Sequence, residues 1–314
     1  MEPIIPQVDK KLVKQELNES TFLRYTSKAN NELYVIDNQV APNALREVAR
    51  LREITFRDAN AGTGKALDLQ DFDLYDKACK NLILWDPDHE EIIGGYRFTD
   101  WGQVAFEADG QPKVNTSHLF TFTPEFIQGP FSTTIEMARA WVRPDYRTRE
   151  MGLKSLYALD NLWDGLGGIV ATHPKIKYLA GKVSLFKTQP KKSRNAIIYF
   201  MQKFLNGGQS MLAKNPEIIS PEEAAYYDSI FTASTMMDNY RLLQSFVKSC
   251  GDAIPPMVNM YINLSPTMKT FGCVCDPDFG EVYDMFILIT LEDVYQERYG
   301  RYIQSYFDCC TYQK

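Results

Sequence analysis

Hydrophobic and polar residues alternate along the first hundred residues with the two periods that distinguish strands from helices. Alternation with a period of two predicts strands at 32–37, 81–86 and 91–100, and the last two form a hairpin. Residues 41–56 repeat apolar positions at helical spacing, and Pro42 stands in the first turn, where a helix tolerates proline. The polar residues 1–32 show no clear period and are expected to form an arm laid over the rest.

The middle of the chain continues the alternation of strand and helix. A long strand is expected at 133–143, ending before Pro144, and a shorter one at 177–186. A helix is expected within 149–173 and another at 190–205. In the earlier hairpin, the adjacent glycines Gly94 and Gly95 predict a β-bulge. Four leucines of the 149–173 helix are expected to face the interior: Leu153, Leu156, Leu159 and Leu162.

The pattern changes near residue 207, where the string NGGQ predicts a hinge. Ser220 and Glu223 then have the spacing of a capping box and predict the start of a helix. Further helices, two strands and a last helix near Glu292 follow. The order predicts an α/β fold with a mixed sheet covered by helices. We expect an N-terminal arm (1–32), a main α/β domain (33–206) and a smaller α+β lobe packed on it (207–314).

The composition narrows the class of protein. With 314 residues, of which 45% are hydrophobic, the chain can bury a sizeable core. Its net charge of −6 excludes nucleic-acid binding that depends on overall positive charge. No apolar run reaches the roughly eighteen residues that span a bilayer, and the N-terminal residues lack a signal-peptide pattern. We expect a cytoplasmic protein with at most peripheral contact with the inner membrane.

The residues of redox and metal chemistry show no functional spacing. The 6 cysteines and 3 histidines do not repeat at intervals typical of zinc ligands, and no cysteine is paired with histidine in an activated setting. We therefore expect reduced thiols, no metal and no permanently bound cofactor.

Four motifs in a fixed order resemble one known family. They are LREITF (51–56), DFDLYD (71–76), IIGGYRF (92–98) and IEMARAWVRPDYR (135–147). Over about residues 45–205 the chain resembles the acyl-ACP-dependent branch of the GNAT superfamily. That branch includes the ornithine-lipid and glycine-lipid N-acyltransferases, often labelled hemolysin-like, and more distantly the acyl-homoserine-lactone synthases. The resemblance implies a GNAT-like fold and transfer of a long-chain or 3-hydroxy acyl group from acyl-ACP or acyl-CoA to glycine or ornithine, for bacterial aminolipid synthesis.

The family's substrate-binding residues can be carried over by position. Arg52 and Phe56 match the helix beside the substrate cleft. Asp73 and Asp76 match the loop that closes over the cleft, and Arg97 matches the arginine of the third strand. The resemblance implies that the aspartates hold the ammonium of the acceptor and that Arg52 and Arg97 hold its carboxylate.

Glu136 and Arg139 match the glutamate and arginine that the family uses at the reaction centre. Glu136 is the candidate general base that would deprotonate the amine, and the alternative is a structural ion pair with Arg97 or Arg139. Residues 136 and 139 are an odd number apart, so a regular strand points them to opposite faces. Only a β-bulge would bring both into one site.

The resemblance also implies a place for the phosphopantetheine arm of the donor. In the family the strands corresponding to 133–143 and 177–186 splay apart, and small residues leave room for the arm. The phosphate is expected at the start of the following helix. The residues concerned are Ala138, Ala140, Val142 and Ser184 on the strands and Arg147, Arg149 and Gly152 before the helix. The chain departs from the family by having Ala138 in place of glycine and by the loop RTREMG, which argues against acetyl-CoA as donor.

Two further groups of residues have a functional and a structural interpretation. A basic cluster fits an acidic acyl carrier protein by charge, or is a solvated helix start: Lys187, Lys191, Lys192 and Arg194. An aromatic set lines an acyl tunnel, or is ordinary core: Trp85, Phe120, Phe122, Phe126 and Phe131. Two alternative functions stay open, a homoserine-lactone-type synthase that uses S-adenosylmethionine and a catalytically silent binding module.

Overall fold

The computed structural model describes residues 1–280 and 282–311, and its contacts form two compact units. Unit 1 contains residues 1–104 and 133–177, together with the described residues from 295 onward. Unit 2 contains residues 105–132 and the described residues of 178–294. The borders of the units differ from the domain boundaries inferred at 32/33 and 206/207, which stay a prediction.

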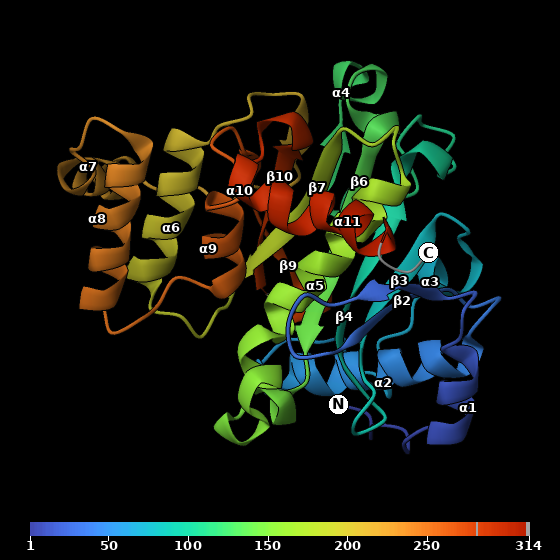
Figure 1. Cartoon of the computed structure of the whole chain (residues 1–314). Coiled ribbons are helices and arrows are strands. Elements are labelled where there is room, and N and C mark those ends of the chain that lie inside the picture. The colour runs from blue at the N-terminus through green and yellow to red at the C-terminus, as the bar shows by residue number, and fades with distance from the viewer. Residues whose placement is uncertain (281, 312–314) are drawn as a thin grey trace. The chain divides into compact units, whose positions relative to one another are not determined.

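Unit 1 is built on antiparallel strands that neighbour one another in a regular order (Figure 1). The strands predicted at 32–37, 81–86, 91–100 and 133–143 are confirmed. An additional strand comes from the N-terminal residues. The order is β1 (Phe22–Tyr25), β2 (Glu32–Ile36), β3 (Cys79–Asp86), β4 (Glu91–Asp100) and β6 (Thr134–Val142).

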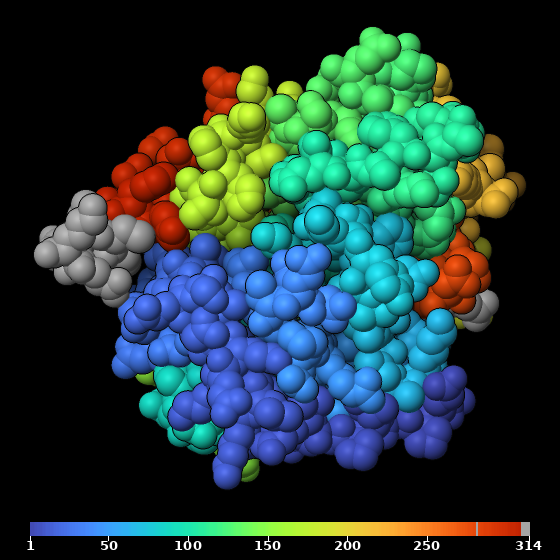
Figure 2. Space-filling model, turned by 90° about the vertical axis from the view of Figure 1, so that its right-hand side faces the viewer, coloured from blue at the N-terminus to red at the C-terminus, as the bar shows by residue number. Residues whose placement is uncertain are grey.

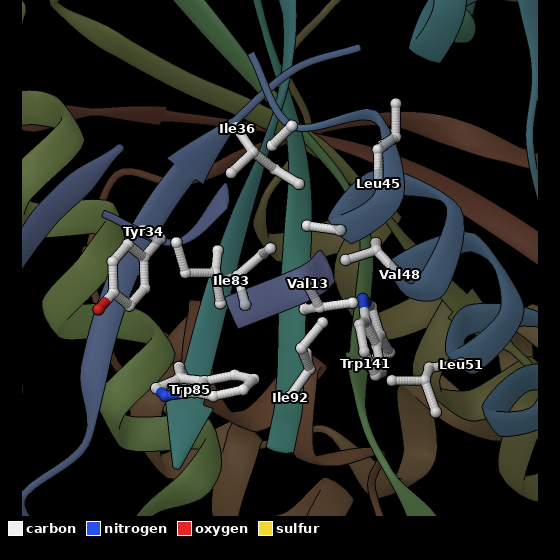
Figure 3. Close-up of a cluster of buried hydrophobic side chains, with 13 residues drawn as sticks. Val13, Tyr34, Ile36, Leu45, Val48, Leu51, Ile83, Trp85, Ile92 and Trp141 are labelled. Atoms are coloured by element: carbon white, nitrogen blue, oxygen red, sulfur yellow. The ribbon is translucent and has the colours of Figure 1, made fainter. Parts of the chain in front are cut away.

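One face of this sheet is covered by α2 (Pro42–Asp58), the helix predicted at 41–56, and by α1 (Lys10–Glu16). Figure 3 shows aliphatic side chains of both helices against the two tryptophans of the sheet, Trp85 and Trp141. Each aliphatic side chain buried here contributes about 1.5–3 kcal/mol to folding. The helical members of the cluster include Val13, Leu45, Val48 and Leu51.

The opposite face is covered by α5 (Gly152–Thr172). A Cβ atom on Gly165 would lie 2.6 Å from a methyl group of Leu82, which points away from its neighbour Ile83 on the α2 face. The prediction that Leu153 and Leu156 face the interior is wrong, because they are 61% and 68% exposed. The buried stripe of α5 begins only at Ala158, so the first turns of the helix extend past the packed part of the unit.

The first 32 residues are more regular than the sequence indicates. They contain α1 and the edge strand β1 as well as an extended start. The backbone N–H of Glu2 donates to the carbonyl of Gly64 over 2.8 Å, and the Glu2 carboxylate accepts from the N–H of Ala66 over 2.9 Å. In Figure 2 the dark-blue start of the chain lies on the surface against the lighter blue of the residues that follow. The arm therefore holds the loop before Asp68.

Unit 1 is completed by residues far along the chain. They form α10 (Gln296–Tyr299), a short π-helical segment at Gly300–Gln304 and α11 (Ser305–Thr311). The hydroxyl of Tyr302 donates to Asp160 on α5 over 2.7 Å. The backbone carbonyl of Tyr302 accepts from Arg24 on β1 over 3.3 Å. A Cβ atom on Gly167 would lie 2.0 Å from the same carbonyl oxygen. The C-terminal segment thus joins α5 to the edge of the sheet.

Unit 2 contains an antiparallel sheet in the order β7 (Tyr178–Leu185), β10 (Val282–Thr290) and β9 (Lys269–Asp276). Glu281, the first residue of the last predicted strand, lies outside the described residues. A smaller pair joins β5 (Phe120–Phe122) to β8 (Met211–Ala213). The predicted capping box of Ser220 and Glu223 is confirmed. The helices are α4 (Pro124–Gln128), α6 (Lys191–Phe204), α7 (Pro221–Ile230), α8 (Met236–Ser249) and α9 (Pro256–Ile262).

No helix within the described residues combines the length and apolarity that spanning a bilayer requires.

The predicted bulge at Gly94 and Gly95 is confirmed by two breaks in strand register. The pairing of β3 with β4 shifts beside Gly94, and the pairing of β4 with β6 shifts just after Gly95. A Cβ atom on Gly94 would collide with the carbonyl oxygen of Trp141. The glycine is therefore required by the close approach of β6 rather than by its own dihedral angles.

Replacing Gly94 by alanine should destabilise the protein, because the backbone of β6 has to move away from the new methyl group. We expect a loss of about 1–3 kcal/mol, which is typical of overpacking. Thermal unfolding followed by circular dichroism measures it as a lower Tm. Gly300→Ala is the control, since a Cβ there meets nothing within 4 Å. An unchanged Tm for Gly94→Ala would contradict the close approach.

Candidate active site

Arg52 lies at the centre of a buried polar network on the α2 side of unit 1. It stands on α2 and is 0% exposed. Its guanidinium donates to both carboxylate oxygens of Asp73, over 3.3 and 3.0 Å, and to the side-chain oxygen of Asn81 over 3.0 Å. Its Nε forms an ion pair with Asp68 Oδ2 at 3.3 Å, and Nη2 also donates to the Asp68 carbonyl. Both terminal nitrogens thus donate to the protein, whereas Nε is held by the ion pair alone and has no hydrogen bond.

Arg97 reaches the same network from β4. Its Nη1 donates to Gln70 Oε1 over 2.7 Å and to Asp73 Oδ2 over 3.2 Å. Its Nη2 is buried and has no hydrogen-bond partner. A buried donor without a partner costs about 1–3 kcal/mol, so this atom is an exception that calls for an explanation.

Asp73 joins the two arginines. It lies in α3 (Asp71–Tyr75), a short helix within a segment that the sequence indicates as a loop, and its side chain completes a capping box with Gln70. Burial opposes ionisation, but the charges of Arg52 and Arg97 outweigh it and hold the pKa of the Asp73 carboxyl well below its ordinary value. Both oxygens already accept from the protein, which favours a role in holding the arginines over direct contact with a substrate ammonium.

Arg139 enters the network through the predicted bulge. Gly95 pairs with Trp141 and Arg97 with Ala138, so two residues of β6 oppose one residue of β4. Arg139 has a φ of 52°, a left-handed conformation that is uncommon outside glycine. This turns its side chain so that Nε donates to Asp68 Oδ2 over 3.1 Å.

Glu136 shares this face of the sheet. It pairs with Thr99, two residues from the pairing of Ala138 with Arg97, and residues two apart on a strand point to the same side. Glu136 is 1% exposed and accepts from Trp101 Nε1 over 3.0 Å. The bulge therefore brings Glu136 and Arg139 to one face, as their odd spacing requires.

The other two predicted substrate residues, Phe56 and Asp76, lie in different surroundings. Phe56 is half-buried, and the guanidinium carbon of Arg139 lies 6.0 Å from the centre of its ring. Asp76 lies at the end of α3, where its carboxylate accepts from the N–H of Ala78 over 2.9 Å. Phe56 is thus part of the site's rim, whereas Asp76 closes a turn.

The residues assigned to the donor lie in both units. On β6 Ala138, Ala140 and Val142 are half-buried, in contrast to the buried residues that precede them. Gly152 begins α5, has a φ of 55° and leaves its surroundings open, and no side chain caps that helix. Ser184 belongs to unit 2 and donates to Asp284 over 2.5 Å. Arg147 and Arg149 are exposed.

The basic cluster is smaller than predicted, and the aromatic set belongs to the core. Arg194 is 7% exposed, and its guanidinium stacks on Tyr283 at 4.2 Å, so it is not part of an exposed basic patch. The exposed cluster reduces to Lys187, Lys191 and Lys192, which we call the unit 2 lysine cluster. The aromatic set is buried and packs as core, with Trp85 in unit 1 and four rings in unit 2: Phe120, Phe122, Phe126 and Phe131.

Four residues of the network were not among the predicted site residues: Asp68, Gln70, Asn81 and Trp101. The only signal for Asp68 was its place in an aspartate-rich segment. Asn81 lies in a strand whose other residues are mostly apolar, and its side chain is buried. A buried amide needs hydrogen-bond partners, so its position indicates a polar residue nearby. Among the described residues, no group of three or more His, Cys, Asp or Glu side chains could hold a metal ion.

Replacing Asp73 by asparagine should destabilise the protein by about 3 kcal/mol or more, because two buried arginines lose their counterion. Since the folded-state pKa of Asp73 is lowered, its contribution is present above the ordinary pKa of about 4 and is lost as the pH falls further. The stability difference between wild type and variant should stay constant above about pH 5 and narrow below about pH 4.

Urea unfolding at a series of pH values measures this difference. Asp71→Asn is the matched control, because Asp71 is an exposed residue of the same short helix. A difference that is equally large at low and neutral pH would show that the carboxylate charge is not what stabilises the network.

Comparison with known proteins places this geometry in a family. Residues 51–156 match the family described as acetyltransferase (GNAT) domain. The chain is 39% identical to glycine N(alpha)-acyltransferase of Bacteroides thetaiotaomicron, covering 98% of this chain and 91% of that protein. It is 37% identical to the protein of the same name from Phocaeicola vulgatus, covering 98% and 94%. Among solved structures, an N-acyl amino acid synthase from uncultured soil microbes is 9% identical with a TM-score of 0.41, covering 84% and 93%.

These findings confirm the resemblance drawn from the four motifs, and with it the GNAT-like α/β fold. Because the similarity to the glycine enzymes extends over nearly the whole chain, the alternative of a catalytically silent module loses its support. The chain belongs to the family of the glycine N(alpha)-acyltransferases and is an N-acyltransferase of the GNAT superfamily.

Proposed function

We propose that this N-acyltransferase moves a long-chain or 3-hydroxy acyl group from a phosphopantetheine thioester to the amine of glycine. The observation that carries the proposal is the position of Glu136 on the same face as the arginine network, to which the bulge also turns Arg139. The names of the relatives from Bacteroides thetaiotaomicron and Phocaeicola vulgatus support glycine as acceptor. The alternative of a homoserine-lactone-type synthase has no comparable support from a close relative.

The proposed reaction is a direct attack without an acyl-enzyme. An α-amine has a pKa of about 8 in a model peptide, so a base must remove a proton at neutral pH. Glu136 takes that proton, and the amine nitrogen attacks the thioester carbonyl carbon to form the new C–N bond. The C–S bond then breaks, and the second proton lost by the nitrogen passes to the leaving thiolate, which is released as the thiol. Positioning of the amine and thioester supplies much of the rate enhancement.

The proposed donor site follows β6 to the start of α5. Ala138, Ala140 and Val142 are half-buried residues of a strand that is otherwise covered, so a pantetheine arm can lie along them. The first turn of α5 has no side-chain cap and no acidic residue, and its N–H groups favour a phosphate. Arg147 and Arg149 add positive charge there.

We propose acyl carrier protein, rather than coenzyme A, as the carrier that docks in the cell. The chain is acidic overall, yet the unit 2 lysine cluster concentrates positive charge at the start of α6. Acyl carrier proteins are acidic, so this cluster is electrostatically complementary to them. The product would be an N-acyl amino acid for aminolipid synthesis.

Replacing Glu136 by glutamine should reduce kcat by about 10²–10⁴-fold, because the amide cannot accept the proton of the amine. The residual rate should rise with pH as the amine loses its proton in solution. Product formation from glycine and acyl-ACP is followed by mass spectrometry across the pH range.

Glu125→Gln is the control, since Glu125 is exposed in unit 2. Full activity of Glu136→Gln with an unchanged pH profile would remove Glu136 from the mechanism. Absence of an N-acyl product from wild type with any amino acid would overturn the proposed function itself.

The double variant Lys191→Glu and Lys192→Glu should raise the KM for acyl-ACP about tenfold, because it reverses the charge of the proposed docking surface. The KM for the same acyl group on coenzyme A should stay unchanged. Lys248→Glu, an exposed residue of α8, is the control. Equal effects on both donors would exclude this surface as the carrier site.

A further inference from the structure

Three buried atoms of the arginine network have no hydrogen-bond partner. One of them, Arg52 Nε, still forms an ion pair with Asp68 Oδ2 at 3.3 Å, and the other two are of opposite kinds. Arg97 Nη2 is a donor without an acceptor, and Asp68 Oδ1 is an acceptor without a donor. Arg97 is 1% exposed and Asp68 is 0% exposed. Burial of an unsatisfied polar atom is unfavourable, so a pair of opposite kinds in one network indicates that something else completes it.

The remaining atoms of the network cannot take this role. The two terminal nitrogens of Arg52 donate to the protein, and its Nε is held by the ion pair with Asp68 Oδ2. Both oxygens of Asp73 already accept from protein donors. Asp68 is different, because only its Oδ2 is used, by Arg52 and Arg139. The second oxygen is therefore held in place by two arginines that bind the first.

We infer that Arg97 and Asp68 bind the acceptor as a zwitterion, with Arg97 Nη2 donating to its carboxylate and Asp68 Oδ1 accepting from its ammonium. The inference rests on the proposed function and names the substrate class, a free α-amino acid with an unblocked carboxyl group. Asp68 thereby determines specificity for the acceptor, although it lies outside the four motifs that resemble the family.

The balance of charge favours such a ligand. Three arginines on this face, Arg52, Arg97 and Arg139, stand with three carboxylates: Asp68, Asp73 and Glu136. A zwitterion adds one charge of each sign, so the buried site remains balanced. An amine without a carboxylate, or an acid without an amine, leaves one charge uncompensated, which is costly in a buried site.

The arrangement also places the ammonium near the proposed base. Asp68 accepts a hydrogen bond from Arg139. Arg139 follows Glu136 on β6, and the bulge directs the side chains of Glu136 and Arg139 to the same face. The residues beside Arg139 are the half-buried ones of the strand, Ala138 and Ala140, together with Phe56 on α2. The network is thus most open where the amine has to meet the thioester.

The first test compares glycine with glycinamide, which keeps the amine and lacks the carboxylate. Wild type should prefer glycine in kcat/KM by about 100-fold or more, because a site that hydrogen-bonds a substrate group rejects the analogue without it. In the Arg97→Gln variant, kcat/KM for glycine should fall towards the value for glycinamide. The kcat/KM of the variant for glycinamide should differ little from that of wild type.

The second test replaces Asp68 by asparagine. The KM for glycine should rise by about 10–100-fold, whereas the KM for the acyl donor should change less than about twofold, because only the ammonium contact is lost. Asp71→Asn, an exposed residue of the following helix, should leave both values unchanged. The fraction of folded protein is measured in parallel by circular dichroism, so that a loss of structure is separated from a loss of binding.

The inference is overturned if wild type acylates glycinamide as well as glycine, or if Asp68→Asn lowers stability and leaves the KM for glycine unchanged. The second result would mean that Asp68 only supports its two arginines and that water completes the network. Either outcome leaves the acyltransferase reaction in place. If instead no amine is acylated by wild type, the proposed function fails first.

Discussion

The buried contact between Arg52 and Asp73 is the interaction on which unit 1 depends. It ties α2 to the short helix α3, and through Asn81 and Arg97 it ties both to the middle of the sheet. Charges buried at this depth are tolerated only when each has partners. The network therefore fixes the position of α2 over the sheet more specifically than the aliphatic side chains around it, which can repack at modest cost.

The bulge at Arg139 converts this structural network into a candidate site. A regular β6 would direct Glu136 and Arg139 to opposite faces, and Asp68 would lose one of its two cationic partners. The left-handed conformation of a non-glycine residue is unfavourable by itself. It persists because Arg139 gains an ion pair with a buried aspartate, and because the glycines of β4 let the strands approach closely.

Much of the fold was predictable, because strand and helix periods are local properties of the chain. The bulge was predictable too, from Gly94, Gly95 and the odd spacing of residues 136 and 139. The partners of Arg52 were not, since they depend on how the segment 57–76 folds back onto α2, and no local period records that. For the same reason Leu153 and Leu156 were assigned to the interior: helical spacing shows which residues share a side, but not where the packed surface stops.

The return of the C-terminal segment to α5 and β1 has a consequence for synthesis of the protein. The contacts of Tyr302 with Asp160 and Arg24 join residues made at the beginning, middle and end of translation. Unit 1 therefore remains incomplete while unit 2 is being translated, and its last contacts form only after residue 302 has left the ribosome. Such distant contacts slow folding, since long loops must close first. Unit 1 therefore completes its fold later in synthesis than the early position of most of its residues suggests.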